Sequence, residues 1–90
     1  MIKFEWDEQK RQTNLAKHRL DFAIAYRIFA DPFALEEEDR SLDYGEPRYK
    51  IIGLVDDVLL LAVYAERGDT IRSISLRRAT AAERKQHEQG

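Results

Sequence analysis

The stretch that decides the fold, residues 48–78, reads RYKIIGLVDDVLLLAVYAERGDTIRSISLRR. It contains consecutive runs rich in the β-branched, aliphatic and aromatic residues that favour strands, at 48–56, 58–67 and 70–78. The runs meet at Asp56-Asp57 and at Gly68-Asp69, and connections this short join antiparallel neighbours. The stretch therefore predicts a meander of antiparallel strands.

The segment before the meander predicts two helices with a strand ahead of them. Residues 2–6 alternate apolar and polar side chains, which is typical of a short strand. Asp7 is placed to cap a helix over residues 8–19, and Asp21 is placed to cap a second helix over residues 22–31.

Residues 22–47 predict the end of the second helix, another strand and a loop. Apolar side chains recur at helical spacing and predict a buried face: Phe22, Ala25, Ile28 and Phe29. Asp31-Pro32 ends the helix, because proline disfavours helical geometry in the residue before it. Residues 33–39 then predict a strand, and residues 39–47 predict a loop rich in turn formers and acids.

The C-terminus predicts a last helix over residues 80–88, since Thr80 and Glu83 have the spacing of a capping box. The resulting order, β-α-α-β-β-β-β-α, is typical of an α+β fold. We expect an antiparallel sheet with the N-terminal helices and the C-terminal helix mostly on one face. A chain of 90 residues is expected to form a single domain over residues 1–90.

Composition excludes several classes of protein. The chain has no cysteine, so it holds no disulfide, thiolate metal site or cysteine nucleophile. The N-terminus lacks the apolar core of a leader peptide, and the longest apolar run, VLLLAV at 58–63, suits a buried strand better than a membrane span. We therefore expect a soluble, cytoplasmic protein with no membrane partner.

Charge is unevenly distributed, although the formal net charge is only −2. From Arg67 onward there are six Lys and Arg against three acids, whereas residues 36–46 hold six acids against Arg40 alone. The basic C-terminal third is compatible with a polyanionic ligand. The acidic segment is either a solvated loop or a docking surface for a basic partner.

The residues present do not predict a metal or cofactor site. The histidines, His18 and His87, belong to different predicted helices, and the carboxylates lack the spacing of a metal site. The glycines are scattered singly, which does not suit a phosphate-binding loop. We expect no metal and no cofactor. His18 is the best single acid–base candidate, because histidine changes charge near neutral pH.

Alternation along the strands predicts which side chains share a face. In the run 58–67, Tyr64 and Glu66 share one face. In the run 70–78, one row holds Ser73, Ser75 and Arg77, and the opposite row holds Arg72, Ile74 and Leu76. Arg72 and Arg77 therefore point to opposite faces unless a bulge intervenes.

We expect the Tyr64 and Glu66 face to lie beside Ser75 and Arg77, away from the helices, and to form a polar groove. Cleavage of RNA without a metal needs a base for the 2′-hydroxyl, cations for the pentacoordinate phosphate and an acid for the leaving oxygen. A guanidinium suits the second role, because its fork matches phosphate oxygens and stays charged.

Each candidate also has a structural interpretation. Arg67 and Arg78 stand at strand ends, where solvated charges are common. Glu66 suits an ion pair with a neighbouring arginine, and Tyr64 suits the wall of a groove. Lys17 and His18 suit a helix C-terminus, where they complement the helix dipole.

The motifs together resemble the BrnT family. They are FEWDEQK…N…KH at 4–18, FA…A…IFADP at 22–32, RYKIIG at 48–53, VYAERG at 63–68 and IRSISLRRATAAERK at 71–85. The resemblance implies a RelE-like fold and the toxin of a type II toxin–antitoxin system, a metal-independent endoribonuclease that inhibits translation and growth. It also implies an RNA substrate and a cognate BrnA-like antitoxin, which neutralises the toxin and binds operator DNA.

The resemblance also implies the site residues. It points to Arg67 and Arg77 for phosphate and transition-state binding, and to Glu66, His18 or Tyr64 for proton transfer. RNA contacts are expected from Lys17, Arg72, Ser75 and Arg78. Members of the family often have glycine where this chain has Arg19.

Other functions remain open at this point. A RelE-like domain that has lost activity would serve as a protein-binding or corepressor module. Direct DNA binding by this chain alone is disfavoured by the net charge and by the lack of a helix-turn-helix pattern. Edge strands at 2–5 or 33–37 would suit an antitoxin strand or helix.

Overall fold

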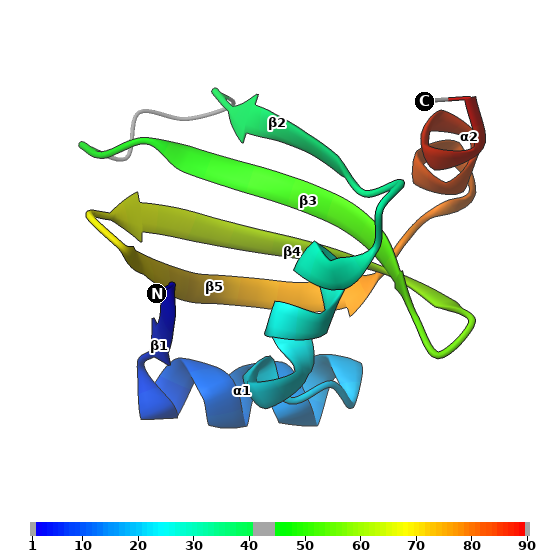
Figure 1. Ribbon diagram of the computed structural model, residues 1–90. Helices are drawn as coiled ribbons and strands as arrows, with labels where there is room; N and C mark the ends of the chain where they lie inside the picture. The colour runs from blue at the N-terminus through cyan, green and yellow to red at the C-terminus, as the bar shows by residue number, and fades with distance from the viewer. Residues whose placement is uncertain (1, 41–44, 90) are drawn as a thin grey trace.

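A mixed five-stranded sheet forms the centre of the molecule, as Figure 1 shows for the computed structural model, which describes residues 2–40 and 45–89. The elements follow the order β1 (Lys3–Trp6), α1 (Glu8–His18), η1 (Phe22–Ala30), β2 (Leu35–Asp39), β3 (Arg48–Val55), β4 (Val58–Arg67), β5 (Thr70–Arg78) and α2 (Ala81–Gln89). This confirms the expected α+β class.

The strand order in the sheet is β1-β5-β4-β3-β2. Strands β2 to β5 form the predicted antiparallel meander, but β1 pairs with β5 in parallel. The expectation of a purely antiparallel sheet was therefore wrong. A long connection separates β1 from β5, and a connection of that length lets two strands run the same way.

Local chemistry sets the helix ends. The Asp7 side chain accepts from the Lys10 amide at 3.1 Å, which caps α1. In α2 the expected capping box is formed, because the Glu83 amide donates to Thr80 Oγ1 at 3.2 Å and the Thr80 amide donates to Glu83 Oε1 at 2.8 Å.

The second helix, η1, is a 3₁₀ helix, where an α-helix was expected. Asp21 caps it as predicted, by accepting from the Ala23 amide at 2.9 Å. The buried residues Phe22, Ala25 and Ile28 are spaced by three, and three residues make one turn of a 3₁₀ helix. The same spacing fits an α-helix, so the sequence pattern did not distinguish the two.

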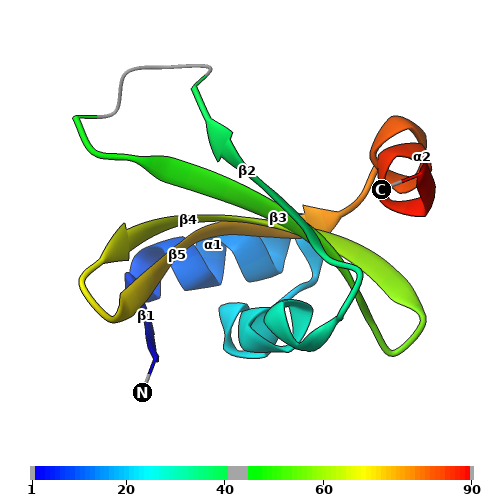
Figure 2. The same ribbon diagram turned by 45° about the horizontal axis from the view of Figure 1, so that its top comes forward.

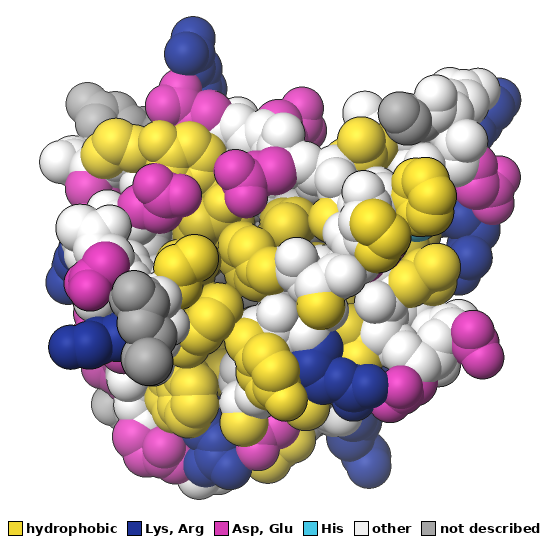
Figure 3. All heavy atoms as spheres, in the orientation of Figure 1, with side chains coloured by type: hydrophobic (Ala, Val, Ile, Leu, Met, Phe, Trp, Pro, Cys, Tyr) yellow, Lys and Arg dark blue, Asp and Glu magenta, His cyan; other side chains and the backbone are white. Residues whose placement is uncertain are grey.

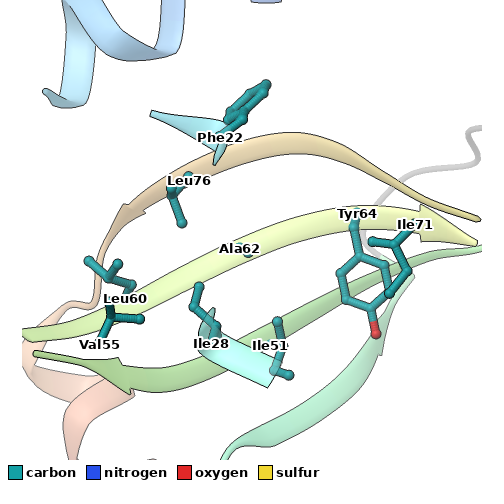
Figure 4. Close-up of a cluster of buried hydrophobic side chains, with 9 residues drawn as sticks. All are labelled: Phe22, Ile28, Ile51, Val55, Leu60, Ala62, Tyr64, Ile71 and Leu76. Carbon is teal, nitrogen blue, oxygen red and sulfur yellow. The ribbon is translucent and has the colours of Figure 1, made fainter. Parts of the chain in front are cut away.

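The core lies between the sheet and the layer formed by α1 and η1. Figure 4 shows side chains from η1, β3, β4 and β5 converging in one buried cluster that includes Ile28, Leu60 and Tyr64. Gly53 of β3 lies against η1, because a Cβ there would stand 2.9 Å from both Ile28 Cγ2 and the Ile28 carbonyl oxygen. The close approach of η1 to β3 therefore requires glycine.

Helix α2 lies on the other face of the sheet, near β2 and β3 (Figures 1 and 2). Its Gln86 borders a small cavity with Ile52 and Lys50 of β3, and its Arg84 borders a groove with Leu59 of β4. The expectation that the helices lie mostly on one face holds for α1 and η1 but not for α2. Across the described ranges 2–40 and 45–89, the helices are too short or too polar to cross a membrane.

Candidate functional site

Strand β5 carries an extra residue that changes which side chains share a face. Tyr64 pairs with Ser73 and Val63 pairs with Ser75, so Ile74 has no partner on β4. Residues that pair across strands point to the same face. Two positions on opposite sides of the bulge, Arg72 and Ser75, therefore point the same way.

Arg77 joins these two residues, because it pairs with Leu61 on the same face of β4 as Val63 and Ala65. Ser73 and Leu76 point to the helix side, where both are buried. The predicted row of Ser73, Ser75 and Arg77 was therefore wrong. The bulge that would bring Arg72 and Arg77 to one face is present.

Strands β3 and β4 add further cations to this face. Arg48 pairs with Ala65, Lys50 pairs with Val63, and Arg67 ends β4 opposite Thr70. We call this surface, opposite α1 and η1, the basic face, and define it by Arg48, Lys50, Arg67, Arg72 and Arg77. Sequence reasoning missed Arg48 and Lys50. Counting back from the Asp56-Asp57 turn in antiparallel register would have found both.

Carboxylates contact the cations of the basic face. Arg77 Nη1 lies 2.8 Å from Glu83 Oε1 of α2, and Arg67 Nη2 lies 3.1 Å from Glu46 Oε1. Further pairs join Arg72 to Glu5 at 3.5 Å and Lys50 to Glu37 at 3.2 Å. A phosphate bound at these positions would replace a carboxylate that already occupies the same donors.

The pKa values of these acids report the same contacts. The hydrogen bonds from Arg77 lower the pKa of Glu83 to about 2. Arg67 likewise lowers the pKa of Glu46. The carboxylates are therefore fully ionised at neutral pH and hold the two guanidinium groups in place.

A groove of about 500 Å³ runs between α1 and β5, next to the basic face. The predicted residues Lys17 and His18 border it from the last turn of α1, and Ser75 borders it from β5. Sequence reasoning did not identify Lys10 and Thr13, which also border the groove and precede Lys17 at helical spacing.

Tyr64 and Glu66 lie on the helix side of the sheet, so the polar groove expected to join them to Arg77 is not formed. Tyr64 is 1% exposed, stacks on Tyr49 at a centroid distance of 5.6 Å and donates to Glu36. Burial raises the pKa of Tyr64 far above its usual value. Figure 4 shows its ring inside the core. Glu66 is exposed and pairs with Ile71.

Arg67 and Arg77 share the basic face but stand at opposite ends of it. Arg77 pairs with Leu61, six residues before Arg67 on β4. At the rise of a strand this separates the two positions by about 20 Å. One phosphodiester therefore does not contact both. Arg78, which pairs with Leu60, leaves β5 on the helix side.

The other face of the molecule has a different character. In Figure 3, which looks onto the side covered by η1, apolar side chains occupy the middle of the view, and acidic side chains lie above them, over β2. Tyr26 is 55% exposed on this side of the molecule. Cations are not gathered here as they are on the basic face.

His87 lies away from the groove, in α2, and contacts Asp31 Oδ2 at 3.1 Å. Burial by itself would raise the pKa of Asp31, but hydrogen bonds from the Leu54 and Phe33 amides and from His87 lower it. Within 2–40 and 45–89, no three acidic or histidine side chains gather as they would around a metal ion.

Comparison with known proteins identifies a family. The model of a family described as the ribonuclease toxin, BrnT, of type II toxin–antitoxin systems matches residues 6–83. The matched region includes α1, the bulged strand β5 and the start of α2. No curated protein matches the chain.

Proposed function

The chain belongs to the BrnT family of ribonuclease toxins of type II toxin–antitoxin systems, and from this premise we propose that it cleaves RNA without a metal, at the junction of the α1–β5 groove and the basic face. The observation that carries the proposal is the bulge at Ile74. It directs Ser75 and Arg77 toward the face that adjoins the groove bordered by Lys17 and His18.

The chemistry assigns one role to each group. His18 takes the proton of the 2′-hydroxyl, the 2′ oxygen bonds to phosphorus, and the bond from phosphorus to the 5′ oxygen breaks. Arg77 and Lys17 bind the phosphate oxygens as their charge rises. The leaving 5′ oxygen takes a proton from solvent. The products are a 2′,3′-cyclic phosphate and a 5′-hydroxyl end.

The remaining cations serve the rest of the strand. Arg72 and Arg67 lie progressively farther from Arg77 along the basic face, so they suit neighbouring phosphates of the same RNA. Ser75 suits a hydrogen bond to the substrate. Tyr64, Glu66 and Arg78 have no role in this mechanism, because their strand register directs them to the helix side.

The experiment is cleavage of a labelled RNA in excess EDTA, with the product ends identified. Arg77→Ala should slow cleavage by about 10²–10³-fold and His18→Ala by about 10²–10⁴-fold. Glu83→Gln is the matched control, because it breaks the same ion pair and keeps the guanidinium; it should not slow cleavage.

Equal losses in Arg77→Ala and Glu83→Gln would assign the effect to the docking of α2 and count against the proposed site. Activity that disappears in EDTA would exclude the metal-independent mechanism. A folded chain that cuts no RNA at any concentration would instead identify a protein-binding or corepressor module.

We propose a BrnA-like, DNA-binding antitoxin as the partner. In its support, β2 is an edge strand that carries Glu36, Glu37 and Glu38, and such an edge suits a basic extended segment. Residues 41–44 of the acidic segment at 36–46 lie outside the described residues. Co-expression with an adjacent ribbon-helix-helix gene should yield a complex that inhibits cleavage and binds operator DNA; separate elution would contradict this.

A further inference from the structure

Asn14, in the middle of α1, is a buried polar side chain that borders the groove beside the proposed site. It is 7% exposed, and its amide makes three hydrogen bonds to backbone groups. Two of them go to Leu76: Nδ2 donates to the carbonyl at 2.9 Å, and Oδ1 accepts from the amide at 3.0 Å. The third is a donation to the Leu20 carbonyl at 3.0 Å.

The contact with Leu76 takes the place of a strand. β1 pairs with β5 only as far as Ser73, so beyond that point the outer edge of β5 lies beside α1 (Figure 1). The outward backbone groups of Leu76 would lack a strand partner there, and the Asn14 amide satisfies both. Leu76 itself stands between Ser75 and Arg77.

The same side chain also holds the turn that carries His18. Lys17 and His18 follow Asn14 by three and four residues, which puts them on the same side of the helix one turn later. Arg19 ends α1 in the left-handed conformation, and Asn14 holds the carbonyl just after it. One amide therefore connects the β5 backbone to both ends of the turn around His18.

We infer that Asn14 is a positioning residue. It fixes the position of Lys17 and His18 relative to Ser75 and Arg77, without contacting the substrate. This inference rests on the proposed function. A hydrogen-bonded amide buried between two elements has one favourable geometry, and loss of any of its three bonds leaves a backbone group unsatisfied. The effect of a substitution should thus reach the catalytic step as well as stability.

The test compares Asn14→Ala with Arg11→Ala. Arg11 also connects α1 to Asp21, which follows the C-terminal cap of the helix. Its Nε donates to Asp21 Oδ1 at 2.8 Å, and its Nη2 donates to Asp21 Oδ2 at 2.7 Å. These bonds do not involve β5. The kcat and KM of RNA cleavage are measured at equal folded fraction, checked by circular dichroism.

Asn14→Ala should lower kcat at least tenfold with less than a threefold change in KM, whereas Arg11→Ala should keep kcat within twofold. Asn14→Asp, which accepts from the Leu76 amide but donates nothing to the Leu76 and Leu20 carbonyls, should lose as much as Asn14→Ala. A kcat for Asn14→Ala within twofold of Arg11→Ala would overturn the inference.

NMR gives a readout that does not depend on cleavage. The imidazole proton shifts of His18 and the amide shifts of Ser75 and Arg77 should move together in Asn14→Ala and stay in place in Arg11→Ala. If the wild-type chain cuts no RNA, the proposed function fails, but these chemical shifts still test whether Asn14 positions His18. Unchanged His18 shifts would overturn it.

Should Asn14→Ala fail to fold, hydrogen exchange in the wild-type chain provides the test. Hydrogen exchange at the Leu76 amide should then be slow, as in a paired strand, and Asn14→Ser should speed it at least tenfold. A Leu76 amide that exchanges as fast as the exposed amide of Gly68 would overturn the inference.

Discussion

At the scale of single residues, the guanidinium groups of the basic face differ in how readily they can be released to a phosphate. The pair of Arg67 with Glu46 is half-exposed, and solvent screens such a pair so that it contributes little to stability. The pair of Arg77 with Glu83 is more buried, with Glu83 at 17% side-chain exposure, and the same carboxylate also caps α2. RNA should therefore displace Glu46 more easily than Glu83.

Arg19 gives a prediction about stability. Its φ of +61° lies in the left-handed region, where a side chain is strained and glycine is not. Arg19→Gly should raise the free energy of unfolding by about 0.5–1 kcal/mol, measured by urea denaturation. Arg19→Ala keeps the Cβ and should show no such gain. Destabilisation by Arg19→Gly would contradict this account of the cap.

Tyr64 gives a prediction that separates structure from catalysis. The hydroxyl donates to Glu36 and anchors edge strand β2, while the ring lies in the core. Tyr64→Phe should lower the free energy of unfolding by about 1 kcal/mol. RNA cleavage by the folded variant should stay within twofold of wild type. A loss of cleavage above tenfold in a folded variant would return Tyr64 to the list of proton donors.

At the scale of elements, the caps and the antiparallel meander were predicted correctly, whereas the bulge in β5 and the parallel pairing of β1 were not. Asp7, Asp21 and Thr80 cap as predicted, because a cap depends only on residues within one turn. The bulge at Ile74 and the parallel pairing of β1 depend on contacts between distant segments. A bulge inverts the face to which every residue beyond it points. Because the extra residue was not predicted, Arg72 and Ser73 were assigned to the wrong faces of the sheet.

Helix α2 gives a prediction about pH. The pKa of Glu83 is about 2 in the folded chain, against an ordinary value of 4.5. A lowered pKa stabilises the fold fully above the ordinary value, and this stabilisation is lost as pH falls from about 4.5 toward 2. Glu83→Gln should cost about 1–2 kcal/mol at pH 7, and the difference from wild type should shrink over that acid range.

The measurement is urea unfolding of both proteins at a series of pH values. Asp21, whose pKa Arg11 also lowers to about 2, contributes equally to wild type and Glu83→Gln, so it cancels in the difference. Glu88→Gln, which changes an exposed carboxylate of the same helix, should follow the wild-type curve. A difference that is constant from pH 7 to pH 2 would contradict the assignment to Glu83.

At the scale of the whole molecule, the net charge of −2 conceals a separation between an acidic edge strand and a basic face. Counts along the chain identified the basic C-terminal third, and with it Arg67, Arg72 and Arg77. They could not identify Arg48 and Lys50, which precede that third and reach the face through strand pairing. His18 was identified as an acid–base candidate from histidine chemistry and Lys17 as an RNA contact through motif resemblance, whereas their position beside Ser75 comes from the packing of α1.

The separation of charge predicts how RNA binding depends on salt. If Lys17, Arg67, Arg72 and Arg77 each neutralise one phosphate, the logarithm of the binding constant should fall with the logarithm of salt concentration at a slope of about −3, since each contact on single strands adds about −0.7. Binding of a labelled single strand to His18→Ala, which should cut it about 10²–10⁴-fold more slowly than wild type, gives this slope.

Removing one phosphate contact far from Arg77 should then reduce the slope by the contribution of that contact. Arg67→Ala should reduce its magnitude by about 0.7 and weaken binding without lowering kcat, because Arg67 is about 20 Å from Arg77 along the sheet. Arg27→Ala is the matched control: Arg27 also forms a two-bond pair with an exposed carboxylate, Asp56, at the end of β3 and off the basic face. Equal slopes with and without Arg67→Ala, both measured in His18→Ala, would show that the RNA does not extend along the basic face to the end of β4, and would confine the substrate to the groove beside α1.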